Sequence, residues 1–101
     1  MELWSGEQIL FDVAANLFVG IEGVGGNLKI TNQRIHFNSH KLNIQTGTLD
    51  IPLSQIAQAK KRNTLGLVPN GMSIITKTGQ EFKLVVWNRD RLINCINSMV
   101  S

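Results

Sequence analysis

The stretch from Gly26 to Phe37, GNLKITNQRIHF, decides the fold of this chain. Apolar and polar residues alternate on both sides of Asn32-Gln33, with the apolar positions at Leu28, Ile30, Ile35 and Phe37. A period of two is typical of a strand that buries one face, and a short polar step between two such runs is typical of a hairpin turn. The stretch therefore predicts an antiparallel hairpin.

Further segments have the alternation or composition of strands, and the sequence predicts them at 7–15, 48–53, 57–63, 71–77 and 81–87. Connections are predicted at 16–25, which is rich in glycine, and at 39–47 and 64–70. Pro52 has no amide hydrogen, so its strand is expected at a sheet edge. Thr78-Gly79-Gln80 predicts a compact turn between the last two strands.

Near the C-terminus the apolar period changes to about 3.6 residues, which predicts an amphipathic helix over about 89–100. Asn88 is its expected N-cap, and its apolar stripe consists of Leu92, Ile93, Ile96, Met99 and Val100. About seven short strands cannot lie in one flat sheet without exposing an apolar face. The predicted fold is therefore mainly β, a split barrel of about seven antiparallel strands that the helix caps.

Length and composition set the protein class. The 101 residues suffice for one modest core, so a single domain over 1–101 is expected. Hydrophobic residues make up 43% and charged residues 17%, which favours a globular chain over a disordered one. No apolar stretch approaches the roughly 20 residues of a membrane span, and the first residues lack a signal-peptide pattern. With a single cysteine, Cys95, these features predict a cytoplasmic protein.

The order of several short motifs resembles a GRAM domain, a relative of the pleckstrin-homology fold, and is similar to small bacterial proteins of that kind. The motifs are Glu7 with Ile9 and Leu10, the series Gly26, Leu28, Thr31, Arg34 and Phe37, the step Pro52-Leu53 with Ile56, the runs 62–66 and 69–71, and Val86-Trp87. The resemblance implies a pleckstrin-homology-like barrel that binds membrane lipids or proteins and has no active site. It supports a fold more strongly than a ligand.

The residues themselves do not indicate an enzyme, a cofactor or a nucleotide. The glycines between Gly20 and Gly26 are followed by neither GK[ST] nor a helix, and the seven carboxylates are scattered. His36 and His40 with one cysteine make no metal-ligand set. Each histidine is expected at the surface, and Cys95 is expected to be a structural thiol. Most aromatic residues fall at core positions and not between basic ones, which argues against nucleic acid.

Positive charge gathers at Lys60-Lys61-Arg62, in a chain of net charge +3. Basic residues at the end of a strand commonly discourage pairing between sheet edges. The other interpretation is that this basic triplet binds phosphate groups.

Two predicted loops contain apolar residues: Leu42 and Ile44 beside Lys41 in the first, and Leu65, Leu67 and Val68 in the second. Either these residues fold back as lids on the barrel or they meet a partner. The favoured partner is a protein, including a second copy of the chain, because association buries apolar surface. The alternative is weak peripheral binding to anionic lipid at the inner face of the membrane, with Lys41 and the basic triplet on the phosphates.

Val85 and Trp87 have the same strand parity as Lys83 and so face outward. Bulky side chains are rarely left open. The C-terminal helix or the core is therefore expected to cover both, and a partner is the other possibility.

Overall fold

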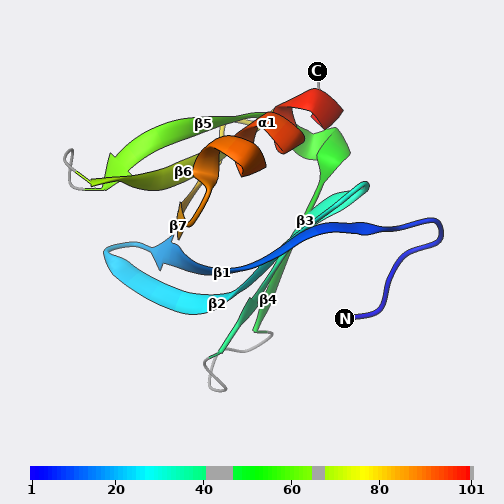
Figure 1. Cartoon of the computed structure of the whole chain (residues 1–101), viewed down its shortest axis with the longest axis horizontal. Helices are drawn as coiled ribbons and strands as arrows, with labels where there is room; N and C mark the ends of the chain where they lie inside the picture. Colours follow the sequence, from blue (N-terminus) through cyan, green and yellow to red (C-terminus); the bar gives the residue numbers. More distant parts are fainter. Residues whose placement is uncertain (41–46, 65–67, 101) are drawn as a thin grey trace.

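The computed structural model describes residues 1–40, 47–64 and 68–100. Figure 1 shows the order of their elements along the chain. They are β1 (Ile9–Val19), β2 (Glu22–Thr31), β3 (Arg34–Ser39), β4 (Thr48–Pro52), the 3₁₀ turn η1 (Leu53–Gln55), β5 (Ile56–Thr64), β6 (Val68–Thr76), β7 (Glu81–Val86) and the helix α1 (Arg89–Val100). None of the described helices is long and apolar enough to cross a membrane.

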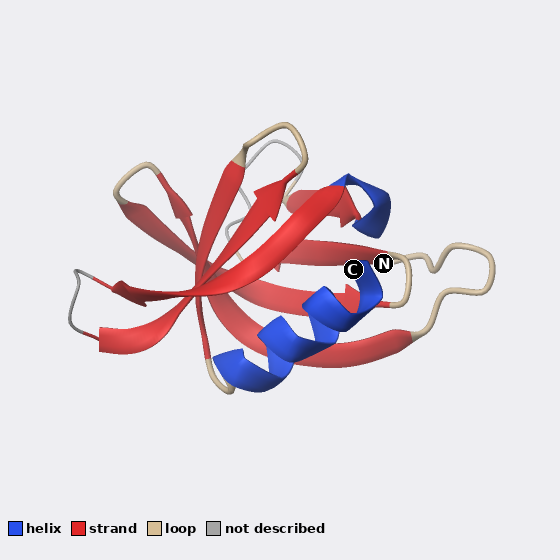
Figure 2. Ribbon diagram, turned by 90° about the horizontal axis from the view of Figure 1, so that it is seen from above, coloured by secondary structure: helices blue, strands red, loops and turns tan. Residues whose placement is uncertain are grey.

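The described strands form one antiparallel sheet in the order β4-β3-β2-β1-β7-β6-β5. The sheet curls into a half-barrel, and α1 lies against it beside β5 (Figure 2). β1 joins the two halves because it pairs with β2 along its length and with β7 only from Ala15 to Leu17. β4, which contains Pro52, is at one edge of the sheet, as its missing amide hydrogen requires. The predicted fold of seven antiparallel strands and a C-terminal helix is confirmed.

The prediction of a connection over 16–25 was wrong. β1 continues to Val19, and β2 already begins at Glu22, with Gly20 at a φ of 63° in the tight turn between them. The other glycines that suggested a loop, Gly23, Gly25 and Gly26, lie inside β2. A side chain at Gly26 would collide with the carbonyl oxygen of Asn38 on β3, so the close approach of β2 and β3 requires glycine there.

The core lies between the curled sheet and α1. Its completely buried side chains are Leu28, Ile30, Ile56, Met72, Ile74, Leu92 and Ile96. Asn97 on α1 accepts a hydrogen bond from the Ala59 amide at 2.8 Å and donates to the Ala59 carbonyl at 2.9 Å. Ala59 belongs to β5 at the sheet edge, so α1 satisfies backbone groups that no neighbouring strand reaches.

The start of α1 differs from the prediction. Asn88 has a φ of 56°, not the extended conformation of an ordinary N-cap. Its carbonyl accepts hydrogen bonds from the amides of Arg91 and Leu92. The turn at Asn88 directs the chain from β7 onto the core side of the sheet. Cys95 on α1 is partly buried against the core, and this burial raises the pKa of its thiol.

Candidate functional site

The side of the sheet that faces away from α1 and the core is called the outer face here. One row of paired residues crosses it from strand to strand: Asn16 pairs with Val85, Val85 with Gly71, and Gly71 with Arg62. Residues that are directly paired across antiparallel strands share a face of the sheet. The row therefore brings together β1, β7, β6 and β5.

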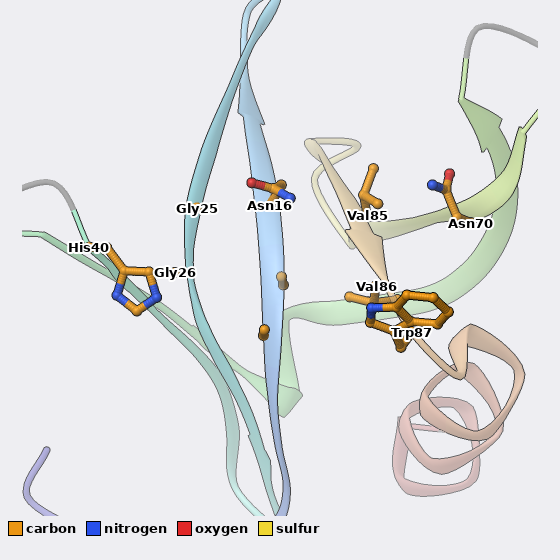
Figure 3. A pocket seen from close by; sticks show the side chains of 10 residues that line it. Asn16, Gly25, Gly26, His40, Asn70, Val85, Val86 and Trp87 are labelled. Atoms are coloured by element: carbon orange, nitrogen blue, oxygen red, sulfur yellow. The ribbon is translucent and has the colours of Figure 1, made fainter.

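A groove of about 400 Å³ lies on the outer face at the β1–β7 end of this row and is called the outer groove. Asn16 and Val85 of the row line it, whereas Gly71 and Arg62 lie beyond its lining. Figure 3 shows His40 on one side of it, Trp87 on the other and Asn16 between them. Its lining includes Asn16, Gly25, His40, Asn70, Val85 and Trp87. The surface is mainly apolar, with two amides and an imidazole that can form hydrogen bonds.

Local backbone features make the groove. β1 and β7 are paired only as far as Val86, and the chain then turns away at Asn88 into α1. On the opposite side Gly25 and Gly26 carry no side chain to fill the space above β2. The groove is therefore the place where two strands separate next to a glycine pair.

Trp87 is 82% exposed, so the prediction that the helix or core covers it was wrong. The reason is the turn at Asn88, which sends α1 to the opposite side of the sheet from Trp87. Val85 is half-buried in the groove lining. Exposed apolar surface of this kind is typical of interaction sites on folded proteins.

The basic triplet does not form a single patch. Lys61 pairs with Met72 on the core-facing side of β5 and forms an ion pair with Asp90 of α1 at 3.1 Å. Lys60 and Arg62 are on the outer face, where Lys60 pairs with Ser73. The predicted cluster of three charges is thus divided between two faces.

Arg62 lies across Gly71 toward β1. A side chain at Gly71 would be 2.6 Å from Cγ of Arg62, so glycine makes room for the arginine. The guanidinium carbon of Arg62 is 5.7 Å from the centre of the Phe18 ring. Nη1 of Arg62 is buried and has no hydrogen-bond partner in the described part of the chain. A shielded donor without an acceptor is unusual in a folded protein.

The predicted apolar loops are mostly outside the described residues, which applies to Lys41, Leu42, Ile44, Leu65 and Leu67. Val68 is described and is 47% exposed. Val19 and Ile21 are also exposed, and they were not predicted because they fell inside the segment interpreted as a connection. Ile21 is fully exposed at the tip of the β1–β2 turn. An isoleucine in a short turn between glycines was the signal that could have identified it.

A second polar cluster fastens the N-terminal segment to the sheet. The Arg34 side chain is buried and donates from Nε and Nη2 to the two carboxylate oxygens of Glu7, at 2.8 and 3.0 Å. The same carboxylate accepts a hydrogen bond from the Thr31 hydroxyl at 2.7 Å. Trp4 covers the guanidinium, with its ring centre 4.0 Å from the guanidinium carbon. The pKa of Glu7 is lowered from its ordinary value of 4.5 to about 2. The hydrogen bond from Arg34 is the main cause, those from Thr31 and the Trp4 amide add to it, and burial acts in the opposite direction.

His36 belongs to the edge of this cluster, and the prediction of a surface imidazole was wrong. It is 6% exposed, and its Nδ1 is 2.6 Å from Oδ1 of Asp50. The same Asp50 oxygen accepts a hydrogen bond from Nη1 of Arg34 at 2.9 Å. The imidazole is enclosed because β3 lies between β2 and β4. His36 is paired with Lys29 of β2 on one side and with Asp50 of β4 on the other. No group of metal-ligating side chains was found among the described residues.

Comparisons with known proteins agree with this architecture. A family model described as the GRAM domain matches residues 2–101. A search of curated proteins finds no match. The C-terminal domain of an unknown protein from Leishmania infantum is similar in structure, with a TM-score of 0.79, 20% identity, and coverage of 95% of this chain and 86% of that one.

The Vps36 N-terminal PH domain is also similar, with a TM-score of 0.75, 16% identity, and coverage of 98% of this chain and 83% of that one. The DH/PH domains of p115-RhoGEF give a TM-score of 0.72 at 8% identity, and the match covers 95% of this chain and 31% of that one. At these identities the likenesses show the fold alone.

Proposed function

Because the chain belongs to the GRAM domain family, whose members are generally interaction modules for proteins or lipids, we propose that it is a non-catalytic module that associates with a protein. The association surface is the outer groove. The module comprises residues 1–101 and acts in the cytoplasm, consistent with a single cysteine that is partly buried.

The observation that carries this proposal is the exposure of Trp87 beside the apolar lining of the groove. Tryptophan is among the residues that contribute most to protein interfaces, because it buries a large apolar area and also has a hydrogen-bond donor. Here the ring is presented to solvent by a turn that forces α1 to the other side of the sheet. The core does not need this tryptophan, so its position is best explained by a partner.

Weak binding to an anionic membrane is the second candidate, and the β1–β2 turn favours it. Val19 and Ile21 are exposed there, and such residues can enter the headgroup region of a bilayer. The basic triplet gives this candidate less support because Lys61 is on the core-facing side of β5 and is paired with Asp90. Two basic residues from the triplet remain on the outer face, and each contributes only about 1 kcal/mol near anionic lipid.

The test compares the whole chain with two serine variants, Trp87→Ser in the groove and Ile21→Ser in the exposed turn. The first measurement is binding to an array of short peptides, each with a central leucine or phenylalanine. We expect Trp87→Ser to weaken binding roughly thirtyfold, the effect of an interface contact worth about 2 kcal/mol. Ile21→Ser is the matched control and should leave peptide binding unchanged. Equal peptide binding by Trp87→Ser and the unmodified chain would contradict the proposal.

Two further measurements identify the kind of partner. Light-scattering mass at several concentrations shows whether the groove binds a second copy, in which case the mass rises with concentration and Trp87→Ser abolishes the rise. Sedimentation with phosphatidylcholine vesicles that contain phosphatidylserine tests the membrane candidate. The lipid alternative would be established if the chain bound vesicles but no peptides, and if that vesicle binding were abolished by Ile21→Ser and released by salt.

A further inference from the structure

We propose that the segment bound in the outer groove is acidic, with an apolar side chain on Val85 and Trp87 and a carboxylate on Arg62. This inference rests on the proposed function, since it names the chemistry of the partner at that same groove. It makes Arg62 the residue that determines specificity and Trp87 the residue that provides apolar contact.

The position of Arg62 is the first support. Gly71 lets the arginine side chain lie flat on the outer face, and the paired row directs it across β6 toward Val85, which lines the groove. The Phe18 ring beneath the guanidinium holds it next to β1. A cation therefore lies just beyond the lining of the apolar groove, near Phe18, while Trp87, which follows β7, lies on the other side of Val85.

The hydrogen bonding of Arg62 is the second support. Its Nη1 is buried and has no acceptor in the described part of the chain, whereas Arg34 has acceptors on Nε, Nη1 and Nη2. The carboxylate is the acceptor that matches a guanidinium best, because both groups are planar and can form two parallel hydrogen bonds. A small rotation of this long side chain turns Nη1 toward the groove, where a carboxylate of the partner satisfies it.

The surrounding charges are the third support. Lys60 and Lys83 flank Ser73 on the outer face, in the row of paired residues next to Arg62 and Gly71. Two acidic residues are described in this area. The Glu81 carboxylate accepts a hydrogen bond from the Ser73 hydroxyl at 2.6 Å, and Glu22 directly precedes Gly23, the residue paired with Phe18. Positive charge therefore exceeds negative charge at this end of the groove, which complements an acidic segment and disfavours a basic one.

The geometry also sets the spacing within the bound segment. Trp87 is two residues beyond Val85, just past the end of β7, and the Arg62 guanidinium is close to Phe18, two residues from Asn16 along β1. An apolar side chain seated between Val85 and Trp87 is therefore about three residues from Phe18 along the strand direction, which is roughly 10 Å at 3.3 Å per residue. An acidic residue about three positions from a leucine or phenylalanine should fit best.

The experiment uses two sets of short labelled peptides that are identical except at one position. One set has glutamate three residues from a leucine, and the other has glutamine there. Fluorescence polarisation with the whole chain should show about tenfold tighter binding of the glutamate set. Arg62→Gln should remove this preference while it retains the weaker binding of both sets, and Arg62→Lys should restore part of it, since lysine keeps the charge without the planar fork.

Lys61→Gln is the matched control because it removes the same charge from the adjacent residue on the core-facing side of β5. It should keep the preference for glutamate. Equal binding of the two peptide sets by the unmodified chain, with both still weakened by Trp87→Ser, would overturn the acidic partner and leave the proposed groove intact. Binding of neither peptide set would overturn both proposals. If the chain then bound phosphatidylserine vesicles in a way that depends on Arg62, the arginine would be a lipid-binding residue.

Discussion

Replacing Glu7 by glutamine tests the buried cluster that holds the N-terminal segment on the sheet. The Glu7 side chain has no exposed surface, and its two oxygens accept hydrogen bonds from Arg34, Thr31 and the amide of Trp4. Glutamine has nearly the same shape but no charge, and its amide nitrogen cannot accept a hydrogen bond. Arg34 is then left buried with the carboxylate of Asp50 and the carbonyl of Glu2.

The size of the effect follows in two ways. Removing one partner from a buried ion pair destabilises proteins by about 3–5 kcal/mol. The fall in the pKa of Glu7 from 4.5 to about 2 corresponds to about 3 kcal/mol. Because Arg34 keeps Asp50, we expect a loss near the lower end, about 3 kcal/mol, which lowers the Tm of a chain of this size by roughly 15 °C.

The assay is urea unfolding of Glu7→Gln and the unmodified chain at several pH values. The folded pKa of Glu7 is lowered, so the charged carboxylate stabilises the fold fully above its unfolded pKa of about 4.5, and the stabilisation is lost as pH falls through about 2. The difference in unfolding free energy should therefore be about 3 kcal/mol at pH 7 and about half of that at pH 3. The pKa of Glu81 is also lowered, but Glu81 is present in both proteins, so its contribution to the pH dependence cancels in the difference.

Glu2→Gln is the control, because Glu2 is exposed and only its backbone carbonyl contacts Arg34. Its effect should stay within about 0.5 kcal/mol. A loss below about 1 kcal/mol for Glu7→Gln, or one that does not shrink in acid, would refute the reasoning.

Two further substitutions test the packing of the sheet. Gly26→Ala should destabilise the fold by about 1–3 kcal/mol because its methyl group collides with the backbone of β3. Gly23→Ala is the control, since its methyl group would only touch the Phe18 ring at an ordinary 3.8 Å and should change stability much less; thermal unfolding distinguishes them. Asn97→Ala should lower stability by about 1–3 kcal/mol and speed hydrogen exchange at the Ala59 amide, while Asn94→Ala on the exposed side of α1 should do neither. Unchanged exchange at Ala59 would show that α1 does not protect the edge of β5.

Much of the fold could be predicted because alternation and helical period act locally. The β2–β3 hairpin, the edge position of Pro52 and the helix stripe all follow from side chains that must reach one core. The lengths of β1 and β2 could not be predicted, because the glycines of β2 allow close contact between strands and do not form a loop. A short-range pattern does not distinguish these two uses of glycine.

The outer groove and the polar cluster depend on residues far apart in the sequence. Glu7 and Arg34 are separated by 27 positions, and only the pairing of β1, β2 and β3 brings them together. Trp87 was expected to be covered because bulky side chains that face outward are rarely left exposed to solvent. Its exposure depends on the direction of one turn, at Asn88, which the sequence pattern does not determine.

The most direct test of the outer groove is the emission of Trp87 itself. The chain has two tryptophans, so a Trp4→Phe variant leaves Trp87 as the only emitter while it keeps an aromatic ring on Arg34. Titration with the glutamate peptides should shift the emission to shorter wavelength and reach saturation, because the bound segment removes the ring from water. Peptide binding by polarisation with unchanged Trp87 emission would contradict the account, since the segment would then bind elsewhere.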